Sequence, residues 1–217
     1  MLNFANLDPA ILITRVITLM IAFTIHELTH ALVANWLGDS TAKDAGRITL
    51  NPIAHIDPFG ALMLLTVGFG WAKATPINPN TLRRRSPAGV MLVSIAGPLS
   101  NLVLAGIAAI FLNLFPALIN QPSNGFLPSL GSFLTYFFLI NITLAVFNLI
   151  PIAPLDGDKI LDYLIPLGWR DAFDRIRPFG SYILLIVAFV LPMMGIPAFS
   201  SVMRQPINTL VQFFLRL

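Results

Sequence analysis

Two histidines and one glutamate form the pattern in this sequence that points most directly to chemistry. Residues 26–30 read HELTH, so His26 and His30 lie four positions apart and Glu27 follows the first of them. On a helix these two positions share one face, so both imidazoles could hold the same metal ion. The glutamate beside them could take a proton from a metal-bound water. The pattern therefore predicts a catalytic metal centre on one helix.

Two histidines leave such a centre incomplete, because a catalytic zinc usually takes three protein ligands. The chain has no cysteine and no second glutamate, so the third ligand has to be an aspartate or His55. Asp156 is the best candidate, because the topology described below places it near the depth of the histidines. His55 lies on a loop, where a histidine more often bonds backbone carbonyls. The aspartates that compete less well lie nearer the water: Asp44, Asp57, Asp158 and Asp162.

Charged residues are too few for a water-soluble surface. They make up 11% of the chain, against about 25% in soluble domains. Hydrophobic residues make up 56%, and the mean hydropathy is +0.80. Residues 86–155 contain neither a charged residue nor a histidine, and a helix needs about 20 apolar residues to cross a bilayer. The net charge of +3 forms no basic patch, so we expect an integral membrane protein that binds no nucleic acid.

The apolar runs predict an all-α integral membrane protein with about five to six transmembrane helices. Residues 199–217 either span the membrane or lie along its surface, and residues 58–69 are long enough for only half of it. We expect a single domain over residues 1–217, with its core at about residues 10–165. Full spans are expected at residues 9–37, 87–115, 132–150 and 178–192.

The polar stretch after the first span is expected to be a re-entrant extended segment. It covers about residues 47–56, where Thr and Ile favour an extended chain and Pro52 breaks any helix. Irregular backbone at membrane depth is tolerated where it lines a water-filled cavity. This segment could therefore bring water to the metal.

Lysine and arginine are concentrated in two loops, which sets the orientation of the chain. By the positive-inside rule both loops are cytoplasmic and the N-terminus is outside. The first and third spans then run in the same direction, and the HELTH pattern and Asp156 both lie near their inner ends. We expect the active site on the cytoplasmic side of a prokaryotic plasma membrane. The basic residues are Lys73, Arg83, Arg84 and Arg85 in one loop, and Lys159, Arg170, Arg175 and Arg177 in the other.

In several motifs the chain resembles the site-2 protease family, the intramembrane zinc metalloproteases of the M50 class. HELTH at residues 26–30 and NLIPIAPLDG at residues 148–157 look like the two signatures of that family. AGPLSN at residues 96–101 is similar to its middle core helix. NPIAHIDP at residues 51–58 and GFGWAK at residues 68–73 resemble its compact members. This chain has no room for the PDZ or CBS domain that many relatives carry.

The resemblance implies a zinc-dependent endopeptidase that cuts peptide bonds within the bilayer. It implies one Zn²⁺ per chain, held by His26, His30 and Asp156. Glu27 would be the general base, and Asn148 would bond the substrate near the scissile peptide.

The substrate implied by the resemblance is a membrane protein with a single transmembrane helix. Such a helix hides its carbonyls in internal hydrogen bonds, so it has to be unwound before a peptide bond is accessible. An exposed strand edge can take up the freed backbone groups. The residues expected to pair with the substrate in this way are Ile48, Thr49, Leu50 and Asn51.

An alternative function is that of a metal-binding or metal-transporting membrane protein without protease activity. A transport path would need several ligands strung along it, whereas the sequence contains one cluster and no further carboxylate inside a span. An intact HELTH pattern with its glutamate also favours the enzyme.

Overall fold

The computed structural model describes residues 9–67, 70–119 and 127–215. Within these ranges the regular structure is helical, and the β-pairing is one isolated bridge between Ile56 and Ala72. Four helical stretches in the described part are long and apolar enough to cross a membrane. This confirms the all-α membrane fold. The four are α1 (Pro9–Trp36), α5 (Gly89–Leu114), α6 (Leu130–Asn148) and the run Leu167–Met193.

The fourth of these stretches contains a change of helix type. A π-helical segment lies in its second half, at Ile186–Val190. Only 6% of its most apolar window is buried, so this span packs loosely against the other helices. Its consecutive parts are α8 (Leu167–Ile176), a 3₁₀ turn (Arg177–Phe179), α9 (Gly180–Leu185), the π-helix and α10 (Leu191–Met193).

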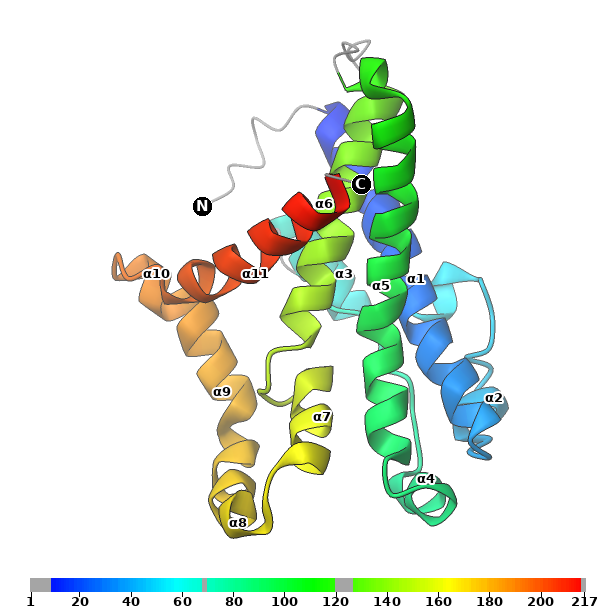
Figure 1. Ribbon diagram of the computed structural model, residues 1–217, viewed down its shortest axis with the longest axis vertical. Coiled ribbons are helices and arrows are strands. Elements are labelled where there is room, and N and C mark those ends of the chain that lie inside the picture. The colour runs from blue at the N-terminus through cyan, green and yellow to red at the C-terminus, as the bar shows by residue number, and fades with distance from the viewer. Residues whose placement is uncertain (1–8, 68–69, 120–126, 216–217) are drawn as a thin grey trace.

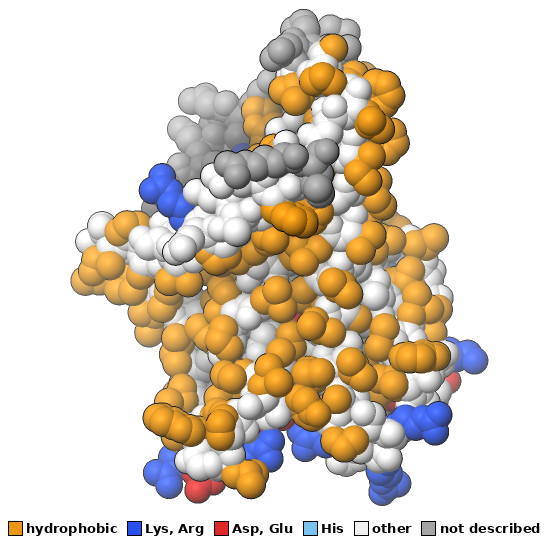
Figure 2. Space-filling model, viewed as in Figure 1, with side chains coloured by type: hydrophobic (Ala, Val, Ile, Leu, Met, Phe, Trp, Pro, Cys, Tyr) orange, Lys and Arg blue, Asp and Glu red, His pale blue; other side chains and the backbone are white. Residues whose placement is uncertain are grey.

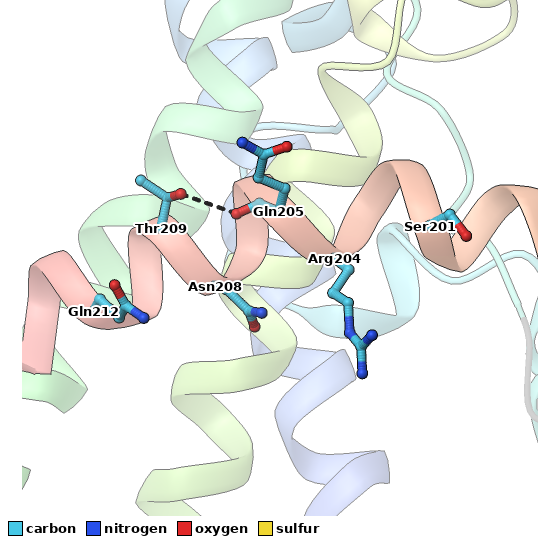
Figure 3. Close-up of a pocket in the computed structure, with 6 residues that line it drawn as sticks. All are labelled: Ser201, Arg204, Gln205, Asn208, Thr209 and Gln212. Atoms are coloured by element: carbon cyan, nitrogen blue, oxygen red, sulfur yellow. Dashed lines mark hydrogen bonds between the residues drawn. The ribbon is translucent and has the colours of Figure 1, made fainter.

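The two remaining predicted segments are not among the four spans. The first, α3 (Pro58–Val67), has ten residues, about 15 Å at 1.5 Å per residue, which covers half a membrane. The second, α11 (Ala198–Leu215), runs across the long helices rather than beside them (Figure 1). Its polar face surrounds a shallow hollow of about 260 Å³ (Figure 3), a pattern typical of a helix lying along a membrane surface. The residues of that face are Ser201, Arg204, Gln205, Asn208, Thr209 and Gln212.

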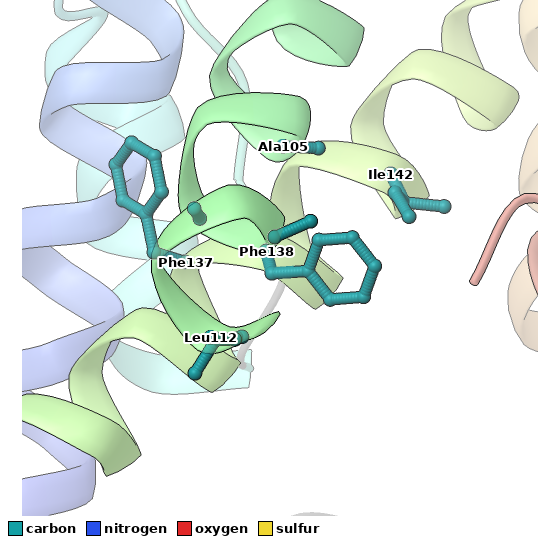
Figure 4. Close-up of a cluster of buried hydrophobic side chains, with 7 residues drawn as sticks. Ala105, Leu112, Phe137, Phe138 and Ile142 are labelled. Atoms are coloured by element: carbon teal, nitrogen blue, oxygen red, sulfur yellow. The ribbon is translucent and has the colours of Figure 1, made fainter. Parts of the chain in front are cut away.

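The central helix of the bundle is α5, which packs against α1, α6 and α7 (Asp156–Leu164). Alanines on α5 let the aromatic rings of α6 approach closely, as at Ala105 and Phe138 (Figure 4). Phe214 of α11 meets the ring of Phe138 edge to face, with ring centroids 6.2 Å apart. The apolar face of α11 thus closes this cluster at one end.

A stripe of small residues determines which face of α1 turns inward. Every fourth residue from Ala10 to Ala34 is buried, and two members of the stripe are His26 and His30. Small side chains let two membrane helices approach closely, so the stripe holds both imidazoles against α5. The stripe consists of Ala10, Thr14, Thr18, Ala22, His26, His30 and Ala34.

The loop after α1 differs from the extended form expected at residues 47–56. A 3₁₀ turn begins at Pro52, because the ring of proline fixes φ at a value that suits the first position of a turn. The side chain of Asn51 caps this turn. Among the described residues, β-pairing of this loop is confined to the bridge between Ile56 and Ala72. Pro52 excludes a regular helix, as expected, but the chain turns there instead of extending.

Charge is segregated along the molecule. Figure 2 shows hydrophobic side chains over the middle, most of the visible lysine and arginine at the end where α2 (Thr41–Asp44), α4 (Pro79–Arg85) and α8 lie, and a further basic group beside α11. A bilayer core excludes such charges, so this end lies at one membrane surface.

Asp39 ties the end of α1 to the start of α4. Its carboxylate is 1% exposed and accepts hydrogen bonds from the Thr41 N–H (3.1 Å), the Thr41 hydroxyl (2.5 Å) and the Asn78 N–H (2.6 Å). Asn78 in turn caps α4. Burial alone would raise the pKa of Asp39, but these hydrogen bonds lower it below its ordinary value of 3.8.

Replacing Asp39 by asparagine should therefore destabilise the fold. The Asp39→Asn amide would turn a donor toward one of these N–H groups, at a cost of about 1–3 kcal/mol in unfolding free energy. The pKa of Asp39 is depressed in the folded state, so its contribution is present above pH 3.8 and lost as pH falls through the folded pKa. Thermal unfolding of purified protein over a pH series measures both effects.

Asp44→Asn is the matched control, because the exposed Asp44 side chain accepts one hydrogen bond within the described part of the chain, from the Ser40 hydroxyl (2.7 Å). Its cost should stay within about 0.5 kcal/mol. Equal melting temperatures for Asp39→Asn and wild type would contradict the assignment.

Candidate metal centre

His26, His30 and Asp156 meet in the interior of the bundle. The Oδ2 atom of Asp156 lies 3.1 Å from Nε2 of each histidine, and the two Nε2 atoms are 3.0 Å apart. All three side chains are buried, with exposed fractions of 6% each. This is the group within the described residues whose geometry suits a metal ion. The structure thus brings together the two histidines of the HELTH pattern and the aspartate favoured as their partner.

The chemistry of the three atoms fits a cation. Each histidine has its Nδ1 occupied elsewhere: that of His26 lies 2.7 Å from Oδ1 of Asn101, and that of His30 lies 2.7 Å from the Val93 carbonyl. A carbonyl oxygen accepts only, so Nδ1 carries the proton in each neutral ring, and each Nε2 presents a lone pair. Two such nitrogens and a carboxylate oxygen repel one another unless a positive charge lies between them.

Their spacing suits zinc in particular. Ligands at about 2.0–2.2 Å in a tetrahedron around Zn²⁺ are about 3.3–3.6 Å from one another, a few tenths of an ångström more than the separations of 3.0 and 3.1 Å found here. Three protein ligands leave the fourth position open, which is the arrangement of catalytic rather than structural zinc sites.

Asp156 reaches the histidines because the chain breaks sharply after α6. Pro151 and Pro154 keep the connection non-helical, and Asp156 then lies in the first turn of α7. Gly157 allows the tight approach, since a Cβ at this position would collide with the carbonyl oxygens of Leu149 and Ile150, just past the end of α6. The other carboxylate oxygen of Asp156 lies 3.4 Å from Nζ of Lys159.

Glu27 is held by the irregular stretch that follows α3. Its Oε2 accepts a hydrogen bond from the Thr75 N–H (2.7 Å), and its backbone carbonyl accepts from the Thr75 hydroxyl (2.9 Å). The carboxylate is therefore oriented by a contact that could not be expected from the sequence. Thr75 lies 48 positions from Glu27, and no pattern links the two.

Arg47 is the second neighbour of Glu27 that sequence reasoning missed. It is 3% exposed, its Nη2 donates to the Lys73 carbonyl, and Nη2 lies 3.9 Å from Oε2 of Glu27. Burial lowers the pKa of Arg47, and the charge of Glu27 opposes that shift. Its Nε and Nη1 have no partner in the described part of the chain. An arginine in a segment expected to enter the membrane is a sequence signal for such a contact, because its charge needs a partner nearby.

Gly97 makes room for the two imidazoles. A Cβ at this position of α5 would lie 2.6 Å from Cε1 of His26 and closer still to the ring of His30. Real side chains do not approach to that distance, so α5 can pass over the rings only where the residue is glycine. The AGPLSN sequence thus contributes both this gap and Asn101.

Two other candidates from the sequence have backbone carbonyls as their hydrogen-bond partners. The ring of His55 is fully buried, with Nε2 2.9 Å from the Thr49 carbonyl, which is the backbone contact expected of a loop histidine. Asn148 ends α6 and donates to the Leu144 carbonyl of its own helix (3.0 Å).

The residues expected to bind substrate lie beside an apolar groove on α1. The groove has a volume of about 300 Å³. The loop contributes Leu50 and Pro52 to its wall. Ile48 and Thr49 are half-buried, and Leu50 and Asn51 are exposed. From α1 it is lined by Ile17, Met20, Ile21, Thr24 and Ile25.

A helix bundle with a His–His–Asp cluster and a glutamate beside it defines a membrane-embedded metallohydrolase. Residues 118–191 match the family model "Peptidase family M50". The chain is 46% identical over 178 residues to "Putative zinc metalloprotease YwhC" of Bacillus subtilis, covering 82% of this chain and 80% of that protein. It is 29% identical over 181 residues to "Putative zinc metalloprotease Rip2" of Mycolicibacterium smegmatis, and equally to that of Mycobacterium tuberculosis. These matches cover 80% of this chain and 65% of each Rip2 protein. No solved structure matches.

The chain belongs to peptidase family M50. It is a zinc-dependent protease embedded in the membrane, and its reaction is the hydrolysis of peptide bonds. The resemblance seen in the sequence is thereby confirmed, and the alternative of a metal transporter without protease activity is not favoured.

Gly97→Ala should weaken zinc binding while leaving the helix intact, because alanine is the better helix former but its Cβ displaces both imidazoles. We expect zinc affinity to fall about 10-fold or more, the scale seen when ligand positioning is disturbed. Metal content after dialysis against a competing chelator measures it.

Gly106→Ala on the same helix is the control. Its Cβ would lie 3.2 Å from Cε1 of Phe214, a side chain that can shift, so zinc should be retained. Full zinc in Gly97→Ala would show that the rings do not occupy these positions.

Proposed function

We propose that His26, His30 and Asp156 hold the zinc and that Glu27 is the general base. The observation that supports this most is the convergence of three lone-pair atoms within 3.1 Å of one another. A zinc ion there supplies a Lewis acid that activates water and polarises a carbonyl. The residues that carry the proposal lie within the core expected at about residues 10–165, in a single domain.

Glu27 takes the proton from the attacking water and passes it to the leaving amine. The Thr75 N–H at 2.7 Å orients the carboxylate through Oε2 and leaves Oε1 for the water. The buried guanidinium of Arg47 has its Nη2 3.9 Å from Oε2 and places an opposite charge beside the carboxylate.

The substrate is a membrane protein with a single transmembrane helix, cut within the lipid bilayer. The apolar groove on α1 suits the apolar side chains of such a helix, and it lies beside the backbone of Ile48–Asn51. Since this loop is bent rather than extended, it offers individual backbone groups, not a continuous strand edge, to the unwound peptide. Asn148 would bond the chain near the cut, because its Oδ1 can still accept while its NH₂ donates to Leu144.

The base and the ligands can be separated by two substitutions. Glu27→Gln should keep one zinc per chain and lower cleavage of single-span peptides by about 10²–10⁴-fold. Asp156→Asn should lose most of the zinc, because an amide oxygen is a weaker ligand than a carboxylate. Metal analysis and peptide cleavage are measured on the same purified samples.

The peptide panel should include matched pairs with and without a glycine near the cut. Helix-breaking residues lower the cost of unwinding, so the glycine-containing member should be cut faster. Full turnover by Glu27→Gln removes it as the base. If Asp156→Asn keeps its full zinc content while His55→Ala loses zinc, the third ligand is His55 and not Asp156.

The active site faces the cytoplasm of a prokaryotic plasma membrane in this proposal. The basic end formed by α2, α4 and α8 supports it, because cytoplasmic loops carry the excess of lysine and arginine. The bacterial relatives fit a plasma membrane.

Cysteines introduced into this cysteine-free chain test the orientation. Ser86→Cys, at the end of α4, should react with a membrane-impermeant thiol reagent only when the cytoplasmic face is accessible. Leu127→Cys, between α5 and α6, should react in intact cells. Labelling of both from the same face would overturn the orientation.

A further inference from the structure

A chain of buried amides leads away from His26 across three helices. Nδ1 of His26 on α1 lies 2.7 Å from Oδ1 of Asn101 on α5. Nδ2 of Asn101 donates to Oδ1 of Asn141 on α6 (2.9 Å), and Nδ2 of Asn141 donates to the Phe137 carbonyl (2.8 Å). Both asparagines are 0% exposed, so these contacts are shielded from bulk water.

The donor-to-acceptor direction of these hydrogen bonds is determined at the far end of the series, at the Phe137 carbonyl. The Phe137 carbonyl can only accept, so Asn141 has to present its NH₂ to it and its oxygen to Asn101. Asn101 then has to present its NH₂ to Asn141 and its oxygen to His26. An oxygen at that position requires a proton on Nδ1 of His26. A backbone carbonyl on α6 thus determines the protonated nitrogen of an imidazole on α1.

We propose that Asn101 and Asn141 are positioning residues that lock His26 in the Nδ1–H tautomer, with Nε2 unprotonated and aimed at the zinc. The proposal rests on the zinc ligands proposed above. Neither asparagine touches zinc or substrate; each acts through His26.

The two histidines reach the same state by routes of different length. His30 is fixed directly, because its Nδ1 lies 2.7 Å from the Val93 carbonyl of α5. The His26 ring has no backbone carbonyl among its hydrogen-bond partners in the described residues, and the two amides carry the constraint from α6 instead. Without them, a free imidazole exchanges its proton between the two nitrogens, and only one of these forms can bind the metal through Nε2.

The tautomer itself can be observed. In the metal-free full-length protein, ¹⁵N spectra of labelled histidine distinguish protonated from unprotonated ring nitrogens, and only His26, His30 and His55 contribute. A His26→Gln sample assigns the signal. Wild type should show His26 as the Nδ1–H form, and Asn101→Leu should show a mixture. An Nε2–H form of His26 in wild type would overturn the proposal.

Zinc affinity, measured by competition with a chromogenic chelator, gives the second readout. Asn101→Leu should lower it by about 10–100-fold, the usual effect of removing the partner of a ligating histidine. Asn101→Asp keeps an acceptor for Nδ1–H and should lose less than Asn101→Leu. Asn141→Leu frees the Asn101 amide to rotate and should fall between wild type and Asn101→Leu.

Asn113→Leu is the matched control on α5. Asn113 donates to the Phe214 carbonyl (3.0 Å), so its loss removes a hydrogen bond between helices without touching the amide chain. Its zinc affinity should equal that of wild type. An affinity of Asn101→Leu within twofold of wild type, or equal losses in Asn101→Leu and Asn101→Asp, would overturn the proposal.

A folding defect is separated from a positioning defect by the double variant. Asn101→Leu alone leaves the buried Asn141 oxygen without a donor, whereas Asn101→Leu with Asn141→Leu removes both partners and is less destabilising. We expect the double variant to melt closer to wild type than Asn101→Leu does, yet to bind zinc as weakly. Recovery of zinc affinity together with stability would assign the asparagines to folding alone.

The ligand set has its own test. If His26→Ala binds zinc like wild type, His26 is not a ligand and both proposals are wrong. If His26→Ala loses zinc while Asn101→Leu keeps it, the ligand set stands and only the role of the asparagines is overturned.

Discussion

Three acceptor atoms held together inside an apolar bundle form the constraint on which the rest of this structure depends. Nε2 of His26, Nε2 of His30 and Oδ2 of Asp156 lie within 3.1 Å of one another, in surroundings where an uncompensated charge or lone pair is costly. Each ring is therefore supported from behind, by Asn101 in one case and the Val93 carbonyl in the other. The small residues of α1 serve the same end, because only they let the rings lie against α5.

Much of this arrangement could be predicted from the sequence. Bilayer thickness dictates the length of an apolar helix, so the span expected at residues 87–115 corresponds closely to α5 (Gly89–Leu114) and that at residues 132–150 to α6 (Leu130–Asn148). The meeting of Asp156 with the histidines also follows from topology, since two parallel spans bring their inner ends to one depth. In both cases the constraint, the length of an apolar helix needed to cross the bilayer, can be counted directly in the sequence.

Contacts between helix faces could not be predicted in this way. The partners of Asn101 and Asn141 cannot be identified from the sequence, because a buried membrane asparagine bonds to whichever neighbour its face meets. That face depends on the rotation of the helix about its axis, which the amino-acid composition does not determine. The loop at residues 47–56 shows a second limit. Pro52 excludes a helix there, but whether the chain then extends or turns depends on the cap supplied by Asn51. The partnership of Glu27 with Thr75 is likewise a matter of tertiary contact alone.

In the proposed ligand set, the separation of the ligands along the chain would couple metal supply to the lifetime of the protein. Asp156 lies 130 positions from His26, so any ion that joins them closes a long loop and holds α1 and α7 against α5. Ligand binding to the folded state alone adds about 4 kcal/mol of stability when free ligand exceeds its dissociation constant about 1,000-fold. In a zinc-starved cell that contribution disappears, and the helices separate more often. Turnover of the enzyme by the cell's own membrane quality control would then rise as zinc falls, so zinc abundance would govern how much of the enzyme persists as well as whether it is active.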